Sequence, residues 1–258
     1  MVHVAFTEGE DRRKTARKAV DDLGHDFLRL LKGAGYIFVY VDVSRDVFET
    51  LRGTLDVLRL YTNAPIVIGD TPERGAMKAF HAAGLEPIPD LYPDVHLLDL
   101  TKDEIVGQDF IRRDGGALHI RRAKTAVEAP FRFALGSVAD WGLGTWIVPP
   151  RETSQGKSWS KGPFIEALSP LEREQLLAFL FRSYPCHASL RDGILSGHGF
   201  LASLDPVAVD TVMATVAGQD AHEIPHLEEL AQSGPWTNEI SEIDVPPAIL
   251  QELLSGNV

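Results

Sequence analysis

The stretch Leu201–Gly218, LASLDPVAVDTVMATVAG, predicts a strand that runs directly into a buried helix. Asp205 stands where an N-cap belongs, because a carboxylate there accepts hydrogen bonds from the free N–H groups of the first helical turn. Pro206 follows at the first helical position, where its missing N–H costs nothing, and Gly218 ends the helix. Asp210 is a second carboxylate in an otherwise mostly apolar helix. Each aspartate is either a structural residue or part of a site, and structural roles are the commoner ones.

Nearly continuous apolar runs at Tyr36–Val43, YIFVYVDV, and at Ala64–Ile68 predict two further strands. Strands of this kind are covered on both faces, so the sheet carries helices on each side. Helical patterns at Asp11–Leu31 and Glu73–Ala83 give a strand–helix alternation, which implies parallel pairing. We therefore expect an α/β fold, a mostly parallel mixed sheet with helices on both faces. The further expected strands are 2–6, 95–100, 188–195, 198–204 and 240–245, with a hairpin between 104–110 and 117–122, and the further helices begin after Ser44 and span 131–138, 170–182, 225–232 and 247–254.

The chain of 258 residues is long enough for one large domain or for two lobes. We assign residues 1–258 to a single domain, and place the boundary of a two-lobe arrangement near 114–116. Residues 142–162 are rich in Gly, Pro, Ser and Thr and predict a long surface loop near the mouth of any pocket.

The composition limits the classes of partner. A net charge of −12 argues against nucleic acid as the main partner, because phosphate binding needs clustered lysine and arginine. No apolar run approaches a membrane span, and the N-terminal residues lack the apolar core of a signal peptide. Cys186 is the one cysteine, so the thiolates of this chain alone hold no iron–sulfur cluster. We expect a cytoplasmic protein.

Several motifs in order along the chain resemble the DUF362 family, a domain of unknown function. They are IVIGDTP at 66–72, ALHIRRAKT at 117–125, LRDGI at 190–194, and LDPVAVD at 204–210 followed by HEIPHLEEL at 222–230. The resemblance implies an α/β fold and a predominantly prokaryotic source, but it implies no assigned chemistry and no named cofactor.

The sequence departs from the family pattern in four places. The Lys-Pro-Asn that usually ends the second strand is replaced by Val41-Asp42-Val43, and the Lys-Thr-His motif reads Lys124-Thr125-Ala126. The usual glycine-rich Gly-Pro stretch is replaced by Gly197–Phe200, and the cysteine set of some members is missing. The chain is identified as a divergent member that has lost part of any chemistry those groups perform.

Two short motifs match catalytic patterns by letter only. His222–His226 reads H-E-x-x-H, which in zinc proteases requires one continuous helix. Pro225 would cost about 3 kcal/mol in a helix interior, so we expect it to begin a helix and leave His222 outside, without a zinc site. Gly156-Lys157-Ser158 is similar to the end of a P-loop, but its first glycine is replaced by Arg151. This segment is either a flexible basic loop or a lid over an anionic ligand.

Candidate ligand-binding residues follow the predicted strands. Asp70 ends a strand and Thr71 begins a helix, and ligands of open parallel sheets lie beyond the carboxyl ends of strands. A metal, a hydroxyl or an ammonium group suits Asp70 better than a phosphate does. Lys124 balances Asp210 or Asp192, as an ion pair or as a proton carrier.

The leading hypothesis is a protein that binds a small polar ligand in a pocket lined by Asp, Lys and His, with acid–base or divalent-metal-assisted chemistry as an open question. The alternative is a non-catalytic interaction or accessory protein that keeps the fold and has lost the site. Oligomeric state and cofactor remain open, and no metal ligand is assigned. The candidate catalytic residues are Lys124, Asp192, His198 and Asp210, and the candidate ligand-binding residues are Asp70, Thr71, Thr125 and Asp205.

Overall fold

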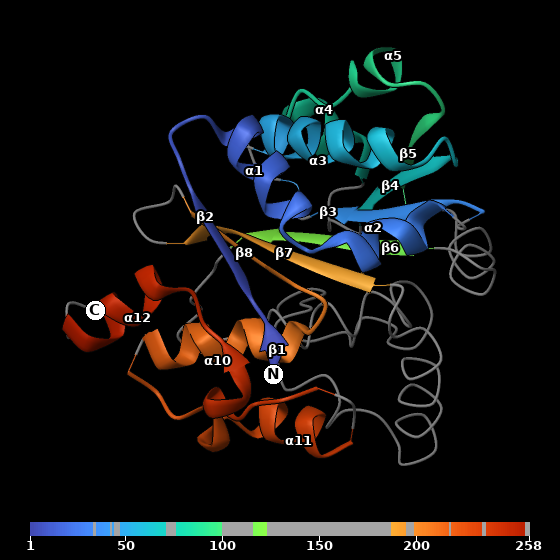
Figure 1. The fold of residues 1–258 in the computed structure, drawn as a ribbon. Coiled ribbons are helices and arrows are strands. Elements are labelled where there is room, and N and C mark those ends of the chain that lie inside the picture. The colour runs from blue at the N-terminus through green and yellow to red at the C-terminus, as the bar shows by residue number, and fades with distance from the viewer. Residues whose placement is uncertain are drawn as a thin grey trace, which may run out of the picture.

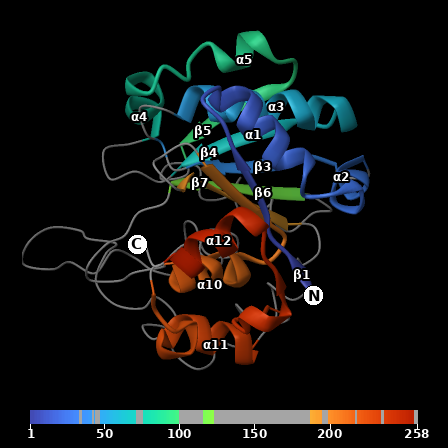
Figure 2. The same ribbon diagram turned by 60° about the vertical axis from the view of Figure 1, so that its left-hand side comes forward.

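A mixed seven-stranded sheet with the order β2-β8-β7-β6-β3-β4-β5 forms the centre of the computed structural model (Figure 1). The structure describes residues 1–32, 35–41, 43, 47–70, 76–99, 116–122, 187–194, 199–216, 218–233 and 236–255. Described helices lie on both sides of the sheet, which Figure 2 shows from a second direction. The predicted α/β fold is confirmed. The strands of this sheet are β2 (Ala5–Glu8), β3 (Ile37–Val41), β4 (Ile66–Asp70), β5 (Val95–Asp99), β6 (Gly116–Arg122), β7 (His187–Ile194) and β8 (Gly199–Ser203).

Five neighbouring strands, from β7 through β6, β3 and β4 to β5, run parallel to one another. Strand β8 pairs antiparallel with β7, and β2 pairs antiparallel with β8. The chain passes from β3 to β4 and β5 on one side of β3, whereas β6 and β7 lie on its other side. The strand order therefore reverses between β3 and β6.

The predicted hairpin around residues 114–116 is wrong. Its second strand exists as β6, but β6 pairs parallel with β3 over Gly116–Ile120 and parallel with β7 over Ala117–Arg122. Because both edges of β6 are occupied, residues 104–110 cannot pair with it as a hairpin partner. The predicted helices at 131–138 and 170–182 and the predicted loop at 142–162 lie outside the described residues. The single-domain assignment and the boundary near 114–116 stay predictions.

The helices α1 to α5 cover one face of the sheet (Figures 1 and 2). Their core contains the expected stripe of α3, in which Val47, Leu51, Leu55 and Leu58 are all buried. Ile37 and Val39 of β3 belong to the same core. The bounds are α1 (Arg12–Asp21), α2 (His25–Lys32), α3 (Val47–Tyr61), α4 (Ala76–Ala82) and α5 (Ile88–Leu91).

The single helix that the sequence predicts for residues 11–31 is wrong, because the structure divides it into α1 and α2. Gly24 separates them with a φ of 95°, a conformation that residues with a side chain rarely adopt. The apolar pattern continues through the break, since Val20 and Phe27 are both fully buried in the same core. Periodicity alone therefore could not show the interruption.

The opposite face of the sheet carries the C-terminal helices α10 (Pro206–Val216), α11 (Pro225–Ser233) and α12 (Pro247–Ser255). Leu201 of β8 and Val212 of α10 belong to one apolar cluster there, together with Ile243. Strand β9 (Ile243–Asp244) pairs parallel with β1 (Val2–His3) as a small second sheet. Two short 3-10 helices, η2 (Ala221–Glu223) and η3 (Ile240–Glu242), complete this layer. No helix in the described part of the chain is long and apolar enough to cross a membrane.

Helices α1 and α3 cross in close contact at Gly53. A Cβ atom at Gly53 would lie 2.2 Å from the carbonyl oxygen of Arg13. Beside this crossing, Arg13 donates two hydrogen bonds to Asp56, of 2.7 and 2.9 Å, and the Tyr92 hydroxyl donates a third of 2.9 Å. Burial raises the pKa of Asp56, but these hydrogen bonds outweigh it and leave the pKa below its ordinary value. A half-buried charged bridge thus fixes the angle at which the two helices meet.

We expect Gly53→Ala to destabilise the protein by about 1–3 kcal/mol or more, because backbone atoms of α1 must move to admit the methyl group. At an ordinary helix position the same change is stabilising by roughly 0.5–1 kcal/mol, so the sign is diagnostic. The matched control is Gly84→Ala: Gly84 has a φ of 69° with no atom near the added Cβ, and the cost there is about 1–2 kcal/mol of backbone strain. Urea denaturation measures both, and a neutral or stabilising Gly53→Ala would contradict the close crossing.

Candidate functional site

The carboxyl ends of the parallel strands carry charged residues at matching positions of the sheet. Asp70 is the last residue of β4 and pairs in register with Asp99, the last residue of β5. Arg122 ends β6 and pairs with Asp192 in β7. Asp70 and Asp192 were predicted from the sequence, whereas Asp99 and Arg122 were not. The signal that could have found these two residues is a charge placed directly at the end of an apolar strand.

Four of the candidate residues, Thr71, Lys124, Thr125 and His198, lie outside the described residues. For Asp70 and Asp192 the structure gives the backbone position in β4 and β7. Three strand spacings separate β4 from β7, which is roughly 14 Å at about 4.8 Å per spacing. The two aspartates therefore flank the central strands β3 and β6 rather than adjoin each other.

Asp205 lies away from this set of strand ends. It follows β8, which runs antiparallel to β7, so the end of β8 lies toward the amino ends of the parallel strands. Four strand spacings separate β8 from β4, or roughly 19 Å. The sheet therefore places Asp205 and Asp70 in different parts of the molecule, too far apart to contact one small ligand together.

Asp205 is the N-cap of α10, as the sequence predicts. Its Oδ1 accepts hydrogen bonds from the backbone N–H groups of Val207 at 2.8 Å and Ala208 at 3.0 Å. Its Oδ2 accepts a further hydrogen bond of 3.0 Å from the N–H of Thr237, which lies beyond α11. The Ser203 hydroxyl accepts from the N–H of Asp205 at 3.0 Å and donates to the carbonyl oxygen of His3 at 2.8 Å. One carboxylate and one hydroxyl thus join strand β1, the end of β8, α10 and the chain after α11.

Burial governs the ionisation of Asp205, whose exposed fraction is 0%. Loss of water raises the pKa of Asp205 to about 6, although the N–H groups of Ala208, Thr237 and Val207 act in the opposite direction. The carboxylate is therefore charged at pH 7 and takes up a proton in weakly acidic solution.

Asp210 is fully buried within α10, with an exposed fraction of 0%. Ala208, Val209 and Val212 of the same helix pack into the apolar cluster on this side of the sheet. Its proposed partner Lys124 lies outside the described residues, so the pairing stays a prediction. Because a buried carboxylate is costly without partners, Asp210 needs hydrogen-bond donors or a cation nearby.

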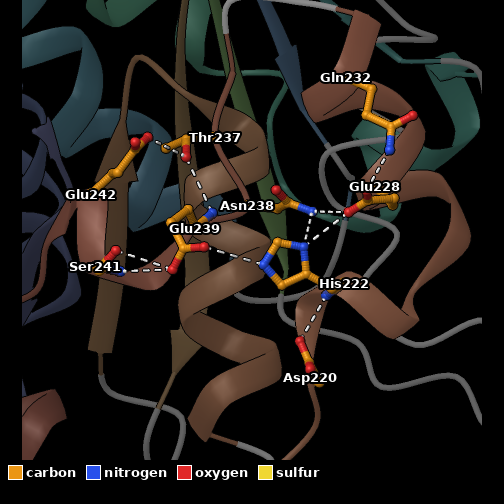
Figure 3. A network of polar contacts seen from close by, with 9 residues as sticks. All are labelled: Asp220, His222, Glu228, Gln232, Thr237, Asn238, Glu239, Ser241 and Glu242. Atoms are coloured by element: carbon orange, nitrogen blue, oxygen red, sulfur yellow. Dashed lines mark hydrogen bonds and ion pairs between the residues drawn. The ribbon is translucent and has the colours of Figure 1, made fainter.

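A polar network surrounds His222 in the C-terminal layer (Figure 3). His222 Nδ1 lies 3.0 Å from Glu228 Oε2 of α11, and Nε2 lies 3.5 Å from Glu239 Oε2, where Glu239 caps η3. Asn238 donates from Nδ2 to Glu228 Oε2 at 2.7 Å. The hydrogen bond with Glu228 has the largest effect and raises the pKa of His222. Desolvation opposes it, and the charges of Glu228, Asp220 and Glu239 raise the pKa further.

The H-E-x-x-H segment does not form the helix that a zinc protease needs. His222 lies in the short helix η2, which ends at Glu223, and α11 begins at Pro225 as predicted. The two histidines therefore belong to different helices, and His222 forms its contacts with Glu228 and Glu239. Among the described residues, no group of three or more His, Cys, Asp and Glu side chains is arranged to hold a metal ion.

Comparisons with known proteins add little to this site. No family model and no curated protein matches the chain. One solved structure has a detectable likeness, the methyltransferase subunit of a type I restriction-modification system from Streptococcus thermophilus. It is 13% identical over 82% of this chain and 39% of its own, so this chain spans well under half of its length, and the TM-score is 0.31. A likeness of this size carries no argument about fold or function.

The raised pKa of Asp205 predicts a specific pH dependence of stability. The proton is held more tightly in the folded state than in the unfolded state, so the contribution is present below about pH 4 and is lost as the pH rises through about 6. The loss amounts to roughly 3 kcal/mol. Asp205→Asn keeps an oxygen for the cap but cannot ionise, so the stability of the wild type relative to this variant should fall between pH 4.5 and pH 7.5. Urea denaturation across this range measures the difference, and a constant difference would refute the shift.

Proposed function

We propose that this protein binds a small polar ligand at the carboxyl edge of its parallel strands, with Asp, Lys and His side chains around it. Acid–base or divalent-metal-assisted chemistry on that ligand is part of the proposal. One observation carries it: the strand order reverses between β3 and β6. In open α/β sheets the connections diverge at such a point and leave a crevice outside the strand ends, where ligands bind.

In this proposal Asp70 belongs to one flank of this crevice, and Lys124, Thr125 and Asp192 belong to the other. Val41 is the last residue of β3 and Arg122 the last of β6, and the two strands pair up to Val41 and Ile120. Lys124 and Thr125 follow Arg122 by two and three positions in the sequence. The residues were chosen from the sequence alone, and the topology supports the choice independently.

The charges at this edge favour a ligand with groups of both signs. Asp70 and Asp99 occupy neighbouring strand ends on one side of the reversal, and Arg122 with Lys124 follows the strand on the other side. Carboxylates suit a cation, an ammonium or a hydroxyl group, whereas arginine and lysine suit an anionic group. A small zwitterionic or polyhydroxylated molecule satisfies both flanks.

In this proposal the candidate residues have different tasks. Lys124 is the charge partner of Asp192 or Asp210 and the candidate proton carrier, and His198, which follows β7, is the candidate acid–base group near neutral pH. Thr71 and Thr125 are the proposed donors of hydroxyl groups to the ligand. The bonds of Asp205 support a structural task, since its carboxylate accepts three backbone N–H groups at the far side of the sheet.

The resemblance to DUF362 supports the same edge. Three of the similar segments, IVIGDTP, ALHIRRAKT and LRDGI, overlap β4, β6 and β7, and the first two extend past the ends of their strands. A net charge of −12 supports a small ligand rather than nucleic acid as the partner, within a cytoplasmic location. The alternative is a non-catalytic interaction or accessory protein that has lost the site. It predicts that substitutions at these positions leave the interactions of the protein with its partner unchanged.

The test is a thermal-shift screen of the full chain with Mg²⁺, Mn²⁺, free amino acids and polyols, with and without either metal. A ligand at 100 times its dissociation constant stabilises by about 2.7 kcal/mol and should raise the melting temperature by several degrees. Lys124→Ala and Asp70→Asn should abolish the shift while the unliganded melting temperature changes little.

Controls of the same residue types come from the surface. Lys18→Ala removes an exposed lysine of α1, and Asp90→Asn an exposed aspartate of α5. Both should keep the full shift. If no probe shifts the wild type, or if Lys124→Ala and Asp70→Asn respond as the wild type does, the accessory-protein alternative is favoured instead.

A further inference from the structure

The C-terminal part of the chain has an unusual distribution of charge. From Asp192 to the C-terminus the sequence contains no lysine and no arginine, and its basic side chains are His198, His222 and His226. The same part is rich in aspartate and glutamate. A cation that this part supplies to its own carboxylates is therefore an imidazolium, which exists only below the pKa of the histidine.

His222 is held between two carboxylates from different elements (Figure 3). Glu228 of α11 lies 3.0 Å from Nδ1, and Glu239 lies 3.5 Å from Nε2. A neutral imidazole carries one N–H group, whereas the imidazolium carries two. A favourable contact with both carboxylates at once, a hydrogen bond with Glu228 and an ion pair with Glu239, therefore requires the protonated ring.

Asn238 also contributes to the dependence of the His222–Glu228 contact on the protonation of the His222 ring. Its Nδ2 donates to Glu228 Oε2 at 2.7 Å and lies 3.3 Å from His222 Nδ1. Only 7% of Asn238 is exposed, so its amide is held in place. Loss of the proton at Nε2 leaves a lone pair facing Glu239, and loss at Nδ1 leaves a lone pair that faces Glu228 and competes with it for the amide of Asn238. Either neutral ring therefore weakens a contact that involves the chain at Asn238 and Glu239.

These contacts hold in place residues 236–242, which lie between α11 and β9 and which we call the 236–242 segment. At its start, the N–H of Thr237 donates to Asp205 Oδ2 at 3.0 Å. Within it, the Thr237 hydroxyl donates to Glu242 at 3.0 Å and accepts from the N–H of Glu239 at 3.1 Å. The segment leads directly into β9, which pairs with β1 near the N-terminus.

We propose that the protonation of His222 controls how firmly the 236–242 segment is attached to α11. The protonated ring binds the segment to α11, and the neutral ring loosens it.

The surroundings of His222 set the direction of this response. The charged groups around it in the described structure are carboxylates: Asp220 and Glu223 on η2 and its cap, Glu228 and Glu229 on α11, and Glu239 and Glu242 on η3. Of these, Glu228, Asp220 and Glu239 raise the pKa of His222 above its ordinary value, so the contribution of the protonated ring is fully present below that ordinary value and is lost as the pH rises through the raised pKa. The pKa of Glu228 is lowered, chiefly by His222, so its contribution is lost only in more strongly acidic solution.

Asp205 reaches the same segment and titrates in a neighbouring pH range. Burial raises its pKa to about 6, whereas the N–H of Thr237 favours the charged carboxylate. Variants of His222 separate the two groups, because they leave the carboxylate of Asp205 unchanged.

The experiment combines two measurements on the full chain. An NMR titration of the His222 ring, assigned by the signal lost in His222→Gln, should give a pKa above the ordinary value of about 6.5. Hydrogen exchange of the 236–242 amides, corrected for intrinsic rates, should show protection falling about two- to fivefold from pH 6 to pH 8.5, the effect expected of an exposed charged pair.

Three variants decide the role of the charge. His222→Gln cannot be protonated and should show low protection at both pH values, whereas His222→Arg stays charged, so the part of the fall in amide protection that depends on His222 should be absent from this variant. Glu223→Gln is the matched control, because Glu223 is an exposed neighbour whose carboxylate is not a partner of His222, and it should behave as the wild type. An unshifted or lowered His222 pKa, or a fall in protection of the same size in His222→Gln, overturns the proposal.

Discussion

The burial of the central parallel strands on both faces is the constraint on which the rest of this structure depends. In β3, Ile37 and Val39 pack into the core beneath α1 to α5, whereas Phe38 packs on the other face with Val67. All four residues are at most 5% exposed. Parallel strands leave no face for water, so the chain must supply a helical layer on each side. The N-terminal half supplies one layer, and the segment from α10 to α12 lies on the opposite side (Figure 2).

The two helical layers are attached by different kinds of interaction. The layer of α1 to α5 is fixed by apolar packing, by the close crossing at Gly53 and by the ion pair from Arg13 to Asp56. The layer of α10 to α12 also packs through an apolar cluster, and two titratable groups whose pKa values are raised add polar contacts to it. Asp205 joins four segments through its carboxylate and the neighbouring Ser203, and His222 joins η2, α11 and η3. We therefore expect the stability of the α10 to α12 layer to depend on pH more than the stability of the α1 to α5 layer does.

Sequence reasoning succeeded where a signal was local. The cap at Asp205, the start of α11 at Pro225 and the inner stripe of α3 each depend on residues within one or two turns, and the structure has all three. It failed where a distant partner decided the outcome. Residues 117–122 form a strand, as predicted, but β3 and β7 occupy its edges, and these lie about 70 to 80 residues away on either side in sequence. Asp99 and Arg122 carry a local signal, a charge at the end of an apolar strand, but only the register shows that they adjoin Asp70 and Asp192.

The sequence by itself determined the α/β class and the positions of most strands and helices among the described residues, because these follow from hydrophobic periodicity and capping chemistry. Only the tertiary structure decided the strand order, the reversal between β3 and β6, and the separation of Asp205 from Asp70. It also showed that His222 meets Glu228 and Glu239. The physical reason is that pairing of strands and of charges depends on which surfaces the packed core brings together, and no short window of sequence contains both partners.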